Sequence, residues 1–429
     1  MRILVLGTNY APERTAVAPF TTGLCEHLAE QGHDIKVITT FPYYPEWRIW
    51  EGYRGLLFRR EQVRNVCLLR VWHFVPGRAS SLVQRLAHDF SFACGAFLAS
   101  PFAGNFDMIY CVSPPPALAL AAYLLAAIRR KPYIIKLTDL ASDAARATGI
   151  LGEGVALRLA RAIERFIYRH AARVVCLCQG FIERLSELGI SPDKLELIPD
   201  WAGTQDAGSF SGPFSGNGAF RKANGFAEEQ FLVMHTGNIG KKQNLMNAVR
   251  AAEISRDRSD LVWVVVGDGE ERSAIGEEIR ARGLANIRLL PFEPAERLPE
   301  MYSSADALLL NQKASVESAV IPSKLLTYMA AGRAVLAAVS EKSEAARLVR
   351  GAQCGLLVPA ENPQALVDAA LLLRENSSLR LKLGSNGRAY AARHFTKQSV
   401  LRAYDALFSR LANEKPLETA AARKAAAGG

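Results

Sequence analysis

The chain has 429 residues, of which 49% are hydrophobic and 22% are charged, and its formal net charge is +10 at pH 7. This length and composition predict two α/β domains with full cores. No stretch reaches about 20 apolar residues, so none is expected to span a bilayer. The seven cysteines form no CxxC pair, which favours reduced thiols over disulfides or zinc ligands. The positive charge permits a nucleic-acid, anionic-lipid or phosphate-bearing partner without selecting one.

The first half alternates short apolar runs with helical patterns, which predicts a doubly wound parallel sheet. Arg2–Leu6 predicts a strand, the segment ending at Gly32 a helix, and Asp34–Thr40 a second strand. Because Gly7 ends the first apolar run so early, no secretory leader is expected. The remaining predicted strands are Met108–Val112, Tyr133–Leu137 and Arg173–Leu177, with helices at Ala117–Arg129 and Ala156–His170.

The second half repeats this pattern after a Gly-, Ser-, Asn- and Ala-rich segment, Ala202–Asn224, which predicts a linker or loop. We therefore expect domains at residues 1–200 and 201–385, helices over 386–412 that pack back toward the first domain, and a flexible tail over 413–429. A helix is predicted at Leu401–Leu411. The predicted strands of the second domain are Phe231–Thr236, Leu261–Val266, Ile287–Leu290, Ala307–Leu310 and Ala334–Ala337.

Two Rossmann-like domains would also suit a dehydrogenase. The first βα turn, Gly7-Thr-Asn-Tyr-Ala-Pro12, however, lacks the GxGxxG pattern that binds a dinucleotide. The second strand ends in Ile38-Thr-Thr40 and not in an acidic residue for a ribose hydroxyl. These features make nicotinamide chemistry a weak alternative.

The loops after the strands of the second half carry a family resemblance. They read Thr236-Gly-Asn-Ile-Gly-Lys-Lys-Gln243, Gly267-Asp-Gly-Glu270, Leu290-Pro-Phe292 and Ile321-Pro-Ser-Lys324. In this order they resemble the donor domain of retaining family 4 glycosyltransferases, whose GT-B fold has two Rossmann-like domains facing a central cleft. The first half contributes Asn9-Tyr-Ala-Pro-Glu13, Glu26–His33, Phe41–Pro45, Thr138-Asp-Leu140 and Ile198–Trp201. The chain looks most like bacterial transferases that build O-antigen, capsule and colanic acid, among them the N-acetylfucosamine transferase-like subgroup.

A nucleotide-sugar diphosphate is best held by the amides of a helix N-terminus together with a cation. Pro322 sets the entry of a short helix closed by Gly332, and Ser323 is expected to be its N-cap. Lys324 in the first turn opposes the helix dipole unless an anion lies beside it. We therefore predict that Lys324 grips the donor phosphates. The alternative is a surface lysine whose stem covers the sheet.

The glycine turn after the strand Phe231–Thr236 is expected to bring backbone close to the phosphates, with lysines to neutralise them. The alternative is an ordinary solvated turn, and relatives often have arginine at Asn238 and lysine near Gln243. The turn at Gly267 is expected to shape the cleft wall, and Phe292 lies in the loop that reads the base in relatives. The predicted donor-binding residues are Gly237, Asn238, Gly240, Lys241, Lys242, Gly267, Asp268, Phe292, Pro322, Ser323, Lys324 and Thr327.

Family members commonly carry two glutamates eight positions apart, one for the donor sugar and one for the ribose. Ala319 and Thr327 occupy these positions here. Glu317 is expected to reach the sugar instead, unless it is a solvent-exposed loop residue. Because no nucleophilic glutamate is evident, the resemblance implies a front-face reaction in which the leaving phosphate deprotonates the acceptor, with no metal and no cofactor.

The acceptor is expected to bind at the first domain. Asp139 follows the strand Tyr133–Leu137, at the edge where open α/β sheets bind ligands, and is the preferred catalytic residue beside Glu317 and Lys324. Asp143 is the second choice, and capping of a helix near Ser142 is the alternative role. The other predicted acceptor-binding residues lie in the first βα loop and are Asn9, Glu13, Arg14 and Thr15.

Residues 47–102 combine positive charge with aromatic side chains. Eight arginines and no lysine lie between Arg48 and Arg85, opposed only by Glu51 and Glu61, and the apolar run Phe90–Phe102 follows. This pattern favours a peripheral contact with anionic lipid and a lipid diphosphate, and a half-buried helical hairpin is the alternative. No nucleic-acid-binding module accompanies these residues, so no nucleic-acid partner is expected.

These features predict a retaining hexosyl- or N-acetylhexosaminyltransferase that moves a sugar from a nucleotide diphosphate, UDP in the first instance, to a polyprenyl-diphosphate-linked saccharide. It would act in surface polysaccharide biosynthesis, in the cytoplasm and on the inner face of the cytoplasmic membrane. Two alternatives stay open. One is a sugar-nucleotide epimerase on the same fold, and the other is a non-catalytic sugar-nucleotide-binding subunit, which Ala319 and Thr327 would suit.

Overall fold

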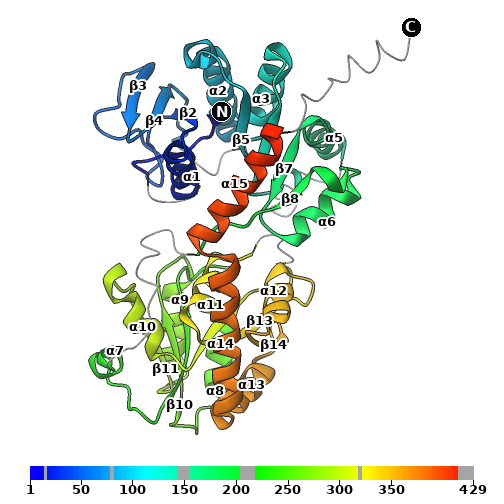
Figure 1. Cartoon of the computed structure of the whole chain (residues 1–429). Coiled ribbons are helices and arrows are strands. Elements are labelled where there is room, and N and C mark those ends of the chain that lie inside the picture. Colours follow the sequence, from blue (N-terminus) through cyan, green and yellow to red (C-terminus); the bar gives the residue numbers. More distant parts are fainter. Residues whose placement is uncertain (14–16, 78–81, 144–153, 203–217, 317–320, 414–429) are drawn as a thin grey trace. The chain divides into compact units, whose positions relative to one another are not determined.

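The computed structural model describes residues 1–13, 17–77, 82–143, 154–202, 218–316 and 321–413 (Figure 1). The chain forms two compact units. The first consists of Met1–Asp200 together with the chain from Val400 onward, and the second of Trp201–Ser399.

The first unit is built on an eight-stranded sheet in the order β3-β4-β2-β1-β5-β6-β7-β8. Its pairs are parallel except β3 with β4, which is antiparallel. The strands are β1 (Arg2–Leu6), β2 (Asp34–Thr40), β3 (Phe58–Val63), β4 (Val66–Val71), β5 (Met108–Ser113), β6 (Tyr133–Leu137), β7 (Arg173–Cys176) and β8 (Leu195–Leu197). The α-helices are α1 (Ala18–Glu30), α2 (Leu82–Ala99), α3 (Pro116–Arg129), α5 (Val155–His170), α6 (Gln179–Glu187) and α15 (Lys397–Asn413), and short 3₁₀ turns lie at Ser100–Ala103 (η1) and Pro192–Lys194 (η2).

The second unit is built on a six-stranded sheet in the order β11-β10-β9-β12-β13-β14, parallel throughout. The strands are β9 (Phe231–Thr236), β10 (Leu261–Val266), β11 (Ile287–Leu290), β12 (Ala307–Asn311), β13 (Ala334–Val339) and β14 (Gly355–Pro359). The helices are α7 (Ala219–Ala223), α8 (Met246–Ile254), α9 (Arg272–Ala281), η4 (Ala295–Arg297), α10 (Leu298–Ser304), α11 (Ser323–Ala331), α12 (Glu344–Ala352), α13 (Pro363–Glu375) and α14 (Ser377–His394).

Helices cover both faces of each sheet, and the strand sequences explain why. In β9, Leu232 and Met234 enter one apolar core, whereas Phe231 and Val233 enter the other. Alternate side chains of a strand point to opposite faces, so a strand buried on both sides is apolar at nearly every position. The predicted α/β class with two Rossmann-like domains is confirmed.

The structure corrects the interpretation of residues 47–102. The segment before α2 forms the antiparallel hairpin β3–β4 and not a helical hairpin. Arg70, counted above among the lipid-facing arginines, is buried. Its guanidinium donates to Glu61 Oε2 (2.7 Å), to the carbonyl of Thr40 (3.1 Å) and to the carbonyl of Ala11, and it lies over the Tyr53 ring. Arg70 therefore holds the hairpin to the sheet and cannot contact lipid.

The predicted linker Ala202–Asn224 also requires a correction at its end, because Ala219–Ala223 forms α7 and Phe220 is fully buried. Residues 203–217 lie outside the described residues, as does the predicted tail beyond 413.

α15 belongs largely to the first unit. Tyr110 Oη donates to Tyr404 Oη (3.0 Å), His27 Nε2 lies 2.9 Å from Asp405 Oδ1, and Arg410 lies 2.8 Å from Glu196. The strand β6 is tied to the end of the first segment, where the buried Lys136 lies 2.5 Å from Asp200.

None of the helices in the described part of the chain combines the length and the apolar character that a transmembrane span requires.

Candidate functional site

The strand order of the second unit defines where a ligand binds. Numbered along the chain, its strands run 3-2-1-4-5-6, so β9 and β12 are neighbours whose connections leave in opposite directions. In open α/β sheets the crevice beyond the carboxyl ends of two such strands is the usual ligand site. The Gly237 turn follows β9, and the chain beyond β12 leads to α11.

Lys324 is a largely buried cation at this edge. Its Nζ lies 3.2 Å from Nε2 of His235, the fifth residue of β9. His235 Nδ1 lies 3.2 Å from the carbonyl of Leu309, so in the tautomer with the proton on Nδ1 the ring donates to this carbonyl and Nε2 accepts from Lys324. Burial lowers the pKa of Lys324 to about 8, and burial together with the Lys324 charge keeps the pKa of His235 well below its usual value.

The mouth of α11 lies beside the Gly237 turn. A Cβ at Gly237 would lie 3.7 Å from Lys324 Nζ, and the φ of Gly237 is 110°. The N-cap of α11 is Pro322, so the prediction that Ser323 is the N-cap is wrong. Ser323 is the first helical residue and is exposed. As predicted, Gly332 closes the helix in a left-handed conformation with φ 68°.

The glycine loop Gly267–Gly269 packs backbone against backbone on the Gly237 turn. The N–H of Gly237 donates to Val266, and that of Ile239 donates to Asp268 (2.8 Å). A Cβ at Gly267 would lie 1.9 Å from the carbonyl oxygen of Gly237, and one at Gly269 would lie 2.4 Å from that of Ile239. The turn at Gly267 therefore supports the Gly237 turn.

The polar side chains of the Gly237 turn are largely exposed. Asn238 Nδ2 donates to Gln243 Oε1 (3.3 Å), which also accepts from the N–H of Gly240 (3.2 Å). Lys241 and Lys242 are exposed, and Lys241 Nζ lies 3.8 Å from Glu270 Oε2. Of the three predicted lysines, only Lys324 is held at a fixed, largely buried position.

The remaining predicted donor residues lie around the same edge. Asp268 is exposed and accepts from the N–H of Gly269 (2.7 Å), and Phe292 is exposed beyond β11. Thr327 Oγ1 donates to the carbonyl of Ser323 (3.5 Å) inside α11. Glu317, the predicted sugar contact, lies outside the described residues.

Three buried side chains that the sequence reading missed hold this edge together. Tyr328 Oη accepts from the N–H of Thr236 (2.9 Å) and so ties α11 to the end of β9. Asn311, at the end of β12, donates to the carbonyls of Gln243 (2.7 Å) and Asn244 (2.9 Å). His235 is the third. Each sits in an apolar strand or helix pattern, where only its polarity among hydrophobic neighbours marks it.

The predicted acceptor residues of the first unit divide into two groups. Asp139 lies beyond β6, is exposed, and accepts from the N–H of Leu140 (2.8 Å). Asp143 pairs with Arg184 (2.8 Å) and Arg161 (3.2 Å); burial opposes ionisation, but the two arginines lower its pKa overall. The N–H of Ser142 donates to the buried Glu164 (3.0 Å). Asp143 thus joins neighbouring helices, whereas Asp139 lies exposed beyond the end of β6.

The first βα loop is more enclosed than predicted. Glu13 is buried, and its Oε1 accepts from the N–H groups of Tyr43 (2.9 Å) and Tyr44 (2.8 Å). Asn9 Nδ2 donates to Glu13 Oε2 (3.0 Å), and burial raises the pKa of Glu13. These two side chains hold the loop after β2. Arg14 and Thr15 lie outside the described residues.

Metal ligands do not gather anywhere in the part of the chain that the structure describes: no three His, Cys, Asp or Glu side chains lie together in a position to hold an ion. The seven cysteines are free thiols.

Comparison with known proteins identifies the family. Residues 15–201 match the glycosyl transferase 4-like domain, and residues 217–390 match the glycosyl transferases group 1. WcaI of Escherichia coli (strain K12), assigned as a glycosyl transferase of colanic acid biosynthesis, is 30% identical over 417 residues, which cover 94% of this chain and 98% of WcaI. This chain belongs to the glycosyltransferase family.

Solved structures share the fold of this glycosyltransferase. Sucrose-phosphate synthase from Thermosynechococcus elongatus has a TM-score of 0.68 at 15% identity and covers 96% of this chain and 98% of its own. HepE from Anabaena, solved in complex with UDP, has a TM-score of 0.66 at 16% identity and covers 96% and 100%. The likeness shows the GT-B fold, as predicted.

Proposed function

We propose that the second unit binds a UDP-sugar with its diphosphate at the mouth of α11 and that the protein transfers the sugar, with retention, to a polyprenyl-diphosphate-linked saccharide of a surface polysaccharide. One observation carries the donor part. The largely buried ammonium of Lys324 has a neutral histidine as its partner, and among the described residues no carboxylate forms an ion pair with it.

An uncompensated buried cation is costly unless an anion joins it. Lys324 stands in the first turn of α11, where the helix dipole adds further positive potential. Two N–H bonds of its ammonium remain after the one to His235. A diphosphate supplies both the charge and the acceptor oxygens that this arrangement lacks, and the Gly237 turn leaves room for its approach.

The relatives support the choice of substrates. The Anabaena protein was solved with UDP and also with UDP-glucose, and the E. coli relative is assigned to colanic acid biosynthesis. We extend both to this chain: UDP as the nucleotide, and a lipid-linked saccharide as the acceptor, bound near Asp139. The enzyme would work at the inner face of the cytoplasmic membrane through a peripheral contact.

The reaction we propose is the front-face transfer. The acceptor hydroxyl attacks the anomeric carbon on the side that the diphosphate leaves, a departing phosphate oxygen takes the hydroxyl proton, and Lys324 stabilises the charge that develops on the leaving group. Glu317 would contact the donor sugar. No metal or cofactor takes part, so activity should survive a chelator.

The test compares binding of UDP and uridine by calorimetry. Lys324→Ala should weaken UDP binding about 10- to 100-fold, the value of a charged hydrogen bond, and leave uridine binding unchanged. Lys382→Ala, which removes an exposed lysine of α14, is the matched control and should bind both like the native chain. Equal UDP affinity in Lys324→Ala and the native chain would refute the donor site. Tight UDP binding without transfer to any lipid-linked acceptor would favour the non-catalytic alternative.

A further inference from the structure

The outward side of α2 is largely apolar, with the exposed Arg85 near its start. Val83, Leu86, Phe90 and Leu98 follow one another at helical spacing, and Phe102 of η1 continues the row. These five side chains are 49% to 76% exposed. A helix on the surface of a protein in water normally turns a polar face outward. The inner side of α2, with Phe92 and Ala96, is buried in the core, so α2 is apolar on both sides.

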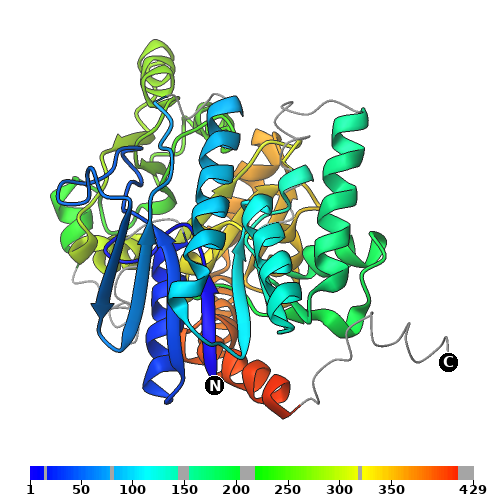
Figure 2. The same ribbon diagram turned by 90° about the horizontal axis from the view of Figure 1, so that it is seen from above.

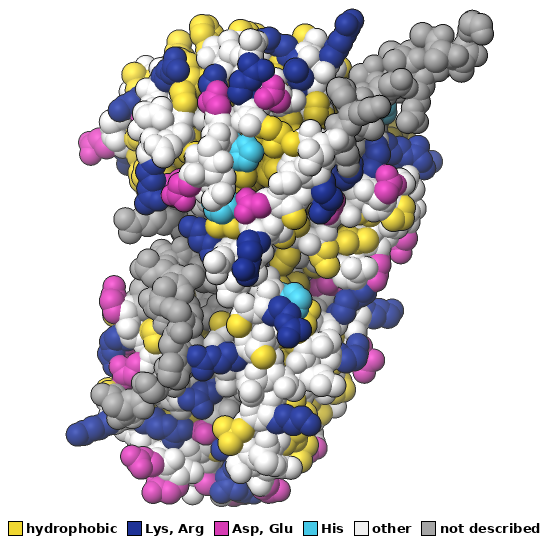
Figure 3. All heavy atoms as spheres, viewed as in Figure 1, with side chains coloured by type: hydrophobic (Ala, Val, Ile, Leu, Met, Phe, Trp, Pro, Cys, Tyr) yellow, Lys and Arg dark blue, Asp and Glu magenta, His cyan; other side chains and the backbone are white. Residues whose placement is uncertain are grey.

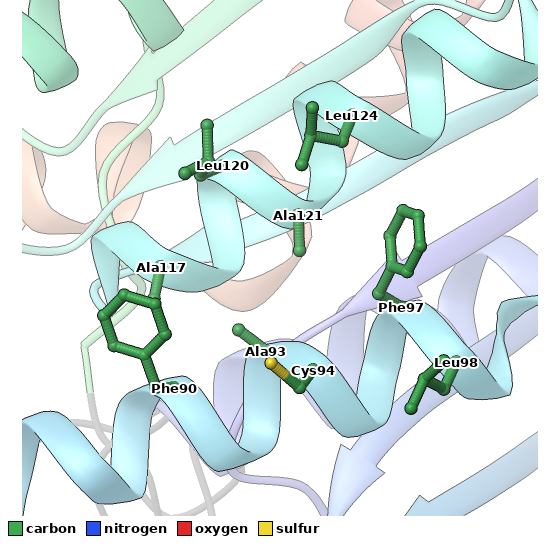
Figure 4. Close-up of a pocket in the computed structure, with 9 residues that line it drawn as sticks. All are labelled: Phe90, Ala93, Cys94, Phe97, Leu98, Ala117, Leu120, Ala121 and Leu124. Carbon is green, nitrogen blue, oxygen red and sulfur yellow. The ribbon is translucent and has the colours of Figure 1, made fainter.

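A groove separates α2 from α3 (Figure 4). Phe90, Cys94 and Leu98 lie on its α2 side, and Ala117, Leu120 and Leu124 on its α3 side. Its volume is about 320 Å³, and every side chain that lines it is apolar. An open, purely apolar groove offers a ligand no hydrogen bond and therefore suits a hydrocarbon chain.

The apolar surface continues onto α3 and α5. α3 packs against both α2 and α5 (Figure 2). The ring centroids of Tyr123 and Phe166 lie 4.9 Å apart. On α3, Leu124 and Ile128 are exposed. The exposed apolar side chains of α5 repeat every three or four residues, at Val155, Leu159, Ile163 and Phe166. The three helices therefore share one apolar face, which we call the α2–α3–α5 face.

Positive charge borders this face. Arg129 at the end of α3 and Arg158, Arg165 and Arg169 of α5 are exposed, and in the space-filling view dark-blue and yellow side chains mix along the upper edge of the first unit (Figure 3). The described residues of the three helices include two carboxylates. Glu164 is buried against Ser142, and Asp89 is half-buried, which raises its pKa to about 6. No fully exposed carboxylate opposes the arginines among these described residues.

We infer that the α2–α3–α5 face docks into the headgroup region of an anionic bilayer, with one lipid hydrocarbon chain in the α2–α3 groove. Arginines beside apolar side chains complement anionic headgroups over acyl chains, whereas a protein partner would leave the one-sided charge unexplained. The described helices lack a transmembrane span, so the contact is interfacial. The inference deepens the membrane contact proposed above by locating it, and it does not require sugar transfer.

The experiment measures sedimentation of the full chain with vesicles of phosphatidylcholine alone and of phosphatidylcholine with about 30 mol% phosphatidylglycerol. The native chain should bind the anionic vesicles preferentially. The double variant Phe90→Ser/Leu98→Ser should bind them about tenfold or more weakly, because it removes two side chains that enter the bilayer. Arg158→Gln/Arg165→Gln should lose the preference for anionic lipid. Leu381→Ser, at an equally exposed leucine of α14, is the matched control and should bind like the native chain.

The readouts separate this inference from the donor site. All of these variants change exposed residues, so their melting temperatures and UDP affinities should match those of the native chain. Failure of UDP binding in the native chain would sink the proposed function and leave the vesicle result standing. Undiminished vesicle binding by Phe90→Ser/Leu98→Ser would overturn the inference. So would a concentration-dependent dimer in the absence of lipid that these two substitutions abolish, since the face would then join two copies of the chain.

Discussion

The ammonium of Lys324 determines how the proposed donor site should respond to pH. Burial lowers its pKa to about 8, from an ordinary value of 10.5, so in the free protein the charge disappears as the pH rises through about 8. Between pH 8 and 10.5 the unfolded chain binds the proton and the folded chain does not. The charged form therefore costs folding stability below pH 8, and this cost is relieved as the pH rises toward 10.5.

UDP should consequently bind less tightly as the pH rises through 8, because binding requires the charged lysine. Lys324→Arg keeps a cation whose pKa lies far above this range, so it should flatten the pH dependence between 7 and 9.5 while retaining measurable affinity. Calorimetry at several pH values measures this, and in the native chain the binding reaction should take up protons near pH 8 to 9. An equally steep loss of affinity in Lys324→Arg would assign the pH dependence to another group.

Residue types pointed to Lys324 as a candidate but not to the side chains that contact it. A lysine in the first helical turn is unusual enough to stand out, whereas His235 lies in the run Phe231–Thr236 and reads as a core residue. Asn311 ends an apolar strand and became visible only through its contacts with the Gln243 and Asn244 carbonyls. For Glu13 the difference runs the other way. As a polar residue in a loop beside a predicted site it was expected to face a ligand, but it is buried and accepts a hydrogen bond from the backbone of Tyr43.

The glycine loops after β9 and β10 act as one element. A Cβ at Gly267 would lie only 1.9 Å from the carbonyl oxygen of Gly237. The two turns would therefore have to move apart if Gly267 carried a side chain. In the proposed function this spacing aligns the backbone that would face the donor phosphates.

Gly267→Ala should therefore destabilise the second unit by about 2–4 kcal/mol and weaken UDP binding, because the Gly237 turn must move. Gly351→Ala is the matched control. Gly351 is exposed in α12 with nothing within 4 Å of an added Cβ, and its substitution should change stability by no more than about 1 kcal/mol. Thermal unfolding with and without UDP measures both effects. Equal melting temperatures for the two variants would contradict the proposed support.

Elements buried on both faces were the easiest to predict. Phe231–Thr236 and Leu261–Val266 have the predicted bounds, because a parallel strand buried on both faces is a nearly continuous apolar run. β3, with the sequence Phe-Arg-Arg-Glu-Gln-Val, is a largely exposed strand at the sheet edge, and its charges conceal it. Hydrophobic patterns in a sequence therefore reveal buried strands but not a charged edge strand such as β3.

For the whole molecule, α15 makes the first unit depend on the far end of the chain. Its buried side chains are Val400, Leu401, Tyr404, Leu407 and Phe408. Each contributes about 1.5–3 kcal/mol on burial, and together they approach the entire stability of a domain, about 5–15 kcal/mol.

A chain ending at Ser399 should therefore lose the fold of the first unit and keep that of the second. Limited proteolysis should digest residues 1–200 of this variant rapidly, while 201–399 stays protected, more so in the presence of UDP. A chain ending at Asn413 is the control and should resist protease like the native chain. Protection of residues 1–200 in the shorter variant would show that α15 is dispensable.

The same return of the chain has a consequence for protein engineering. In the order of the chain, the second unit is an insert between the two segments of the first unit, Met1–Asp200 and the chain from Val400 onward. A hybrid enzyme joined once, after Asp200, would take α15 from the other protein. That helix would then have to pack against Tyr110 of this chain, whose hydroxyl donates to Tyr404 of its own α15. Exchange of sugar-nucleotide specificity between relatives thus calls for two junctions, one on either side of the insert.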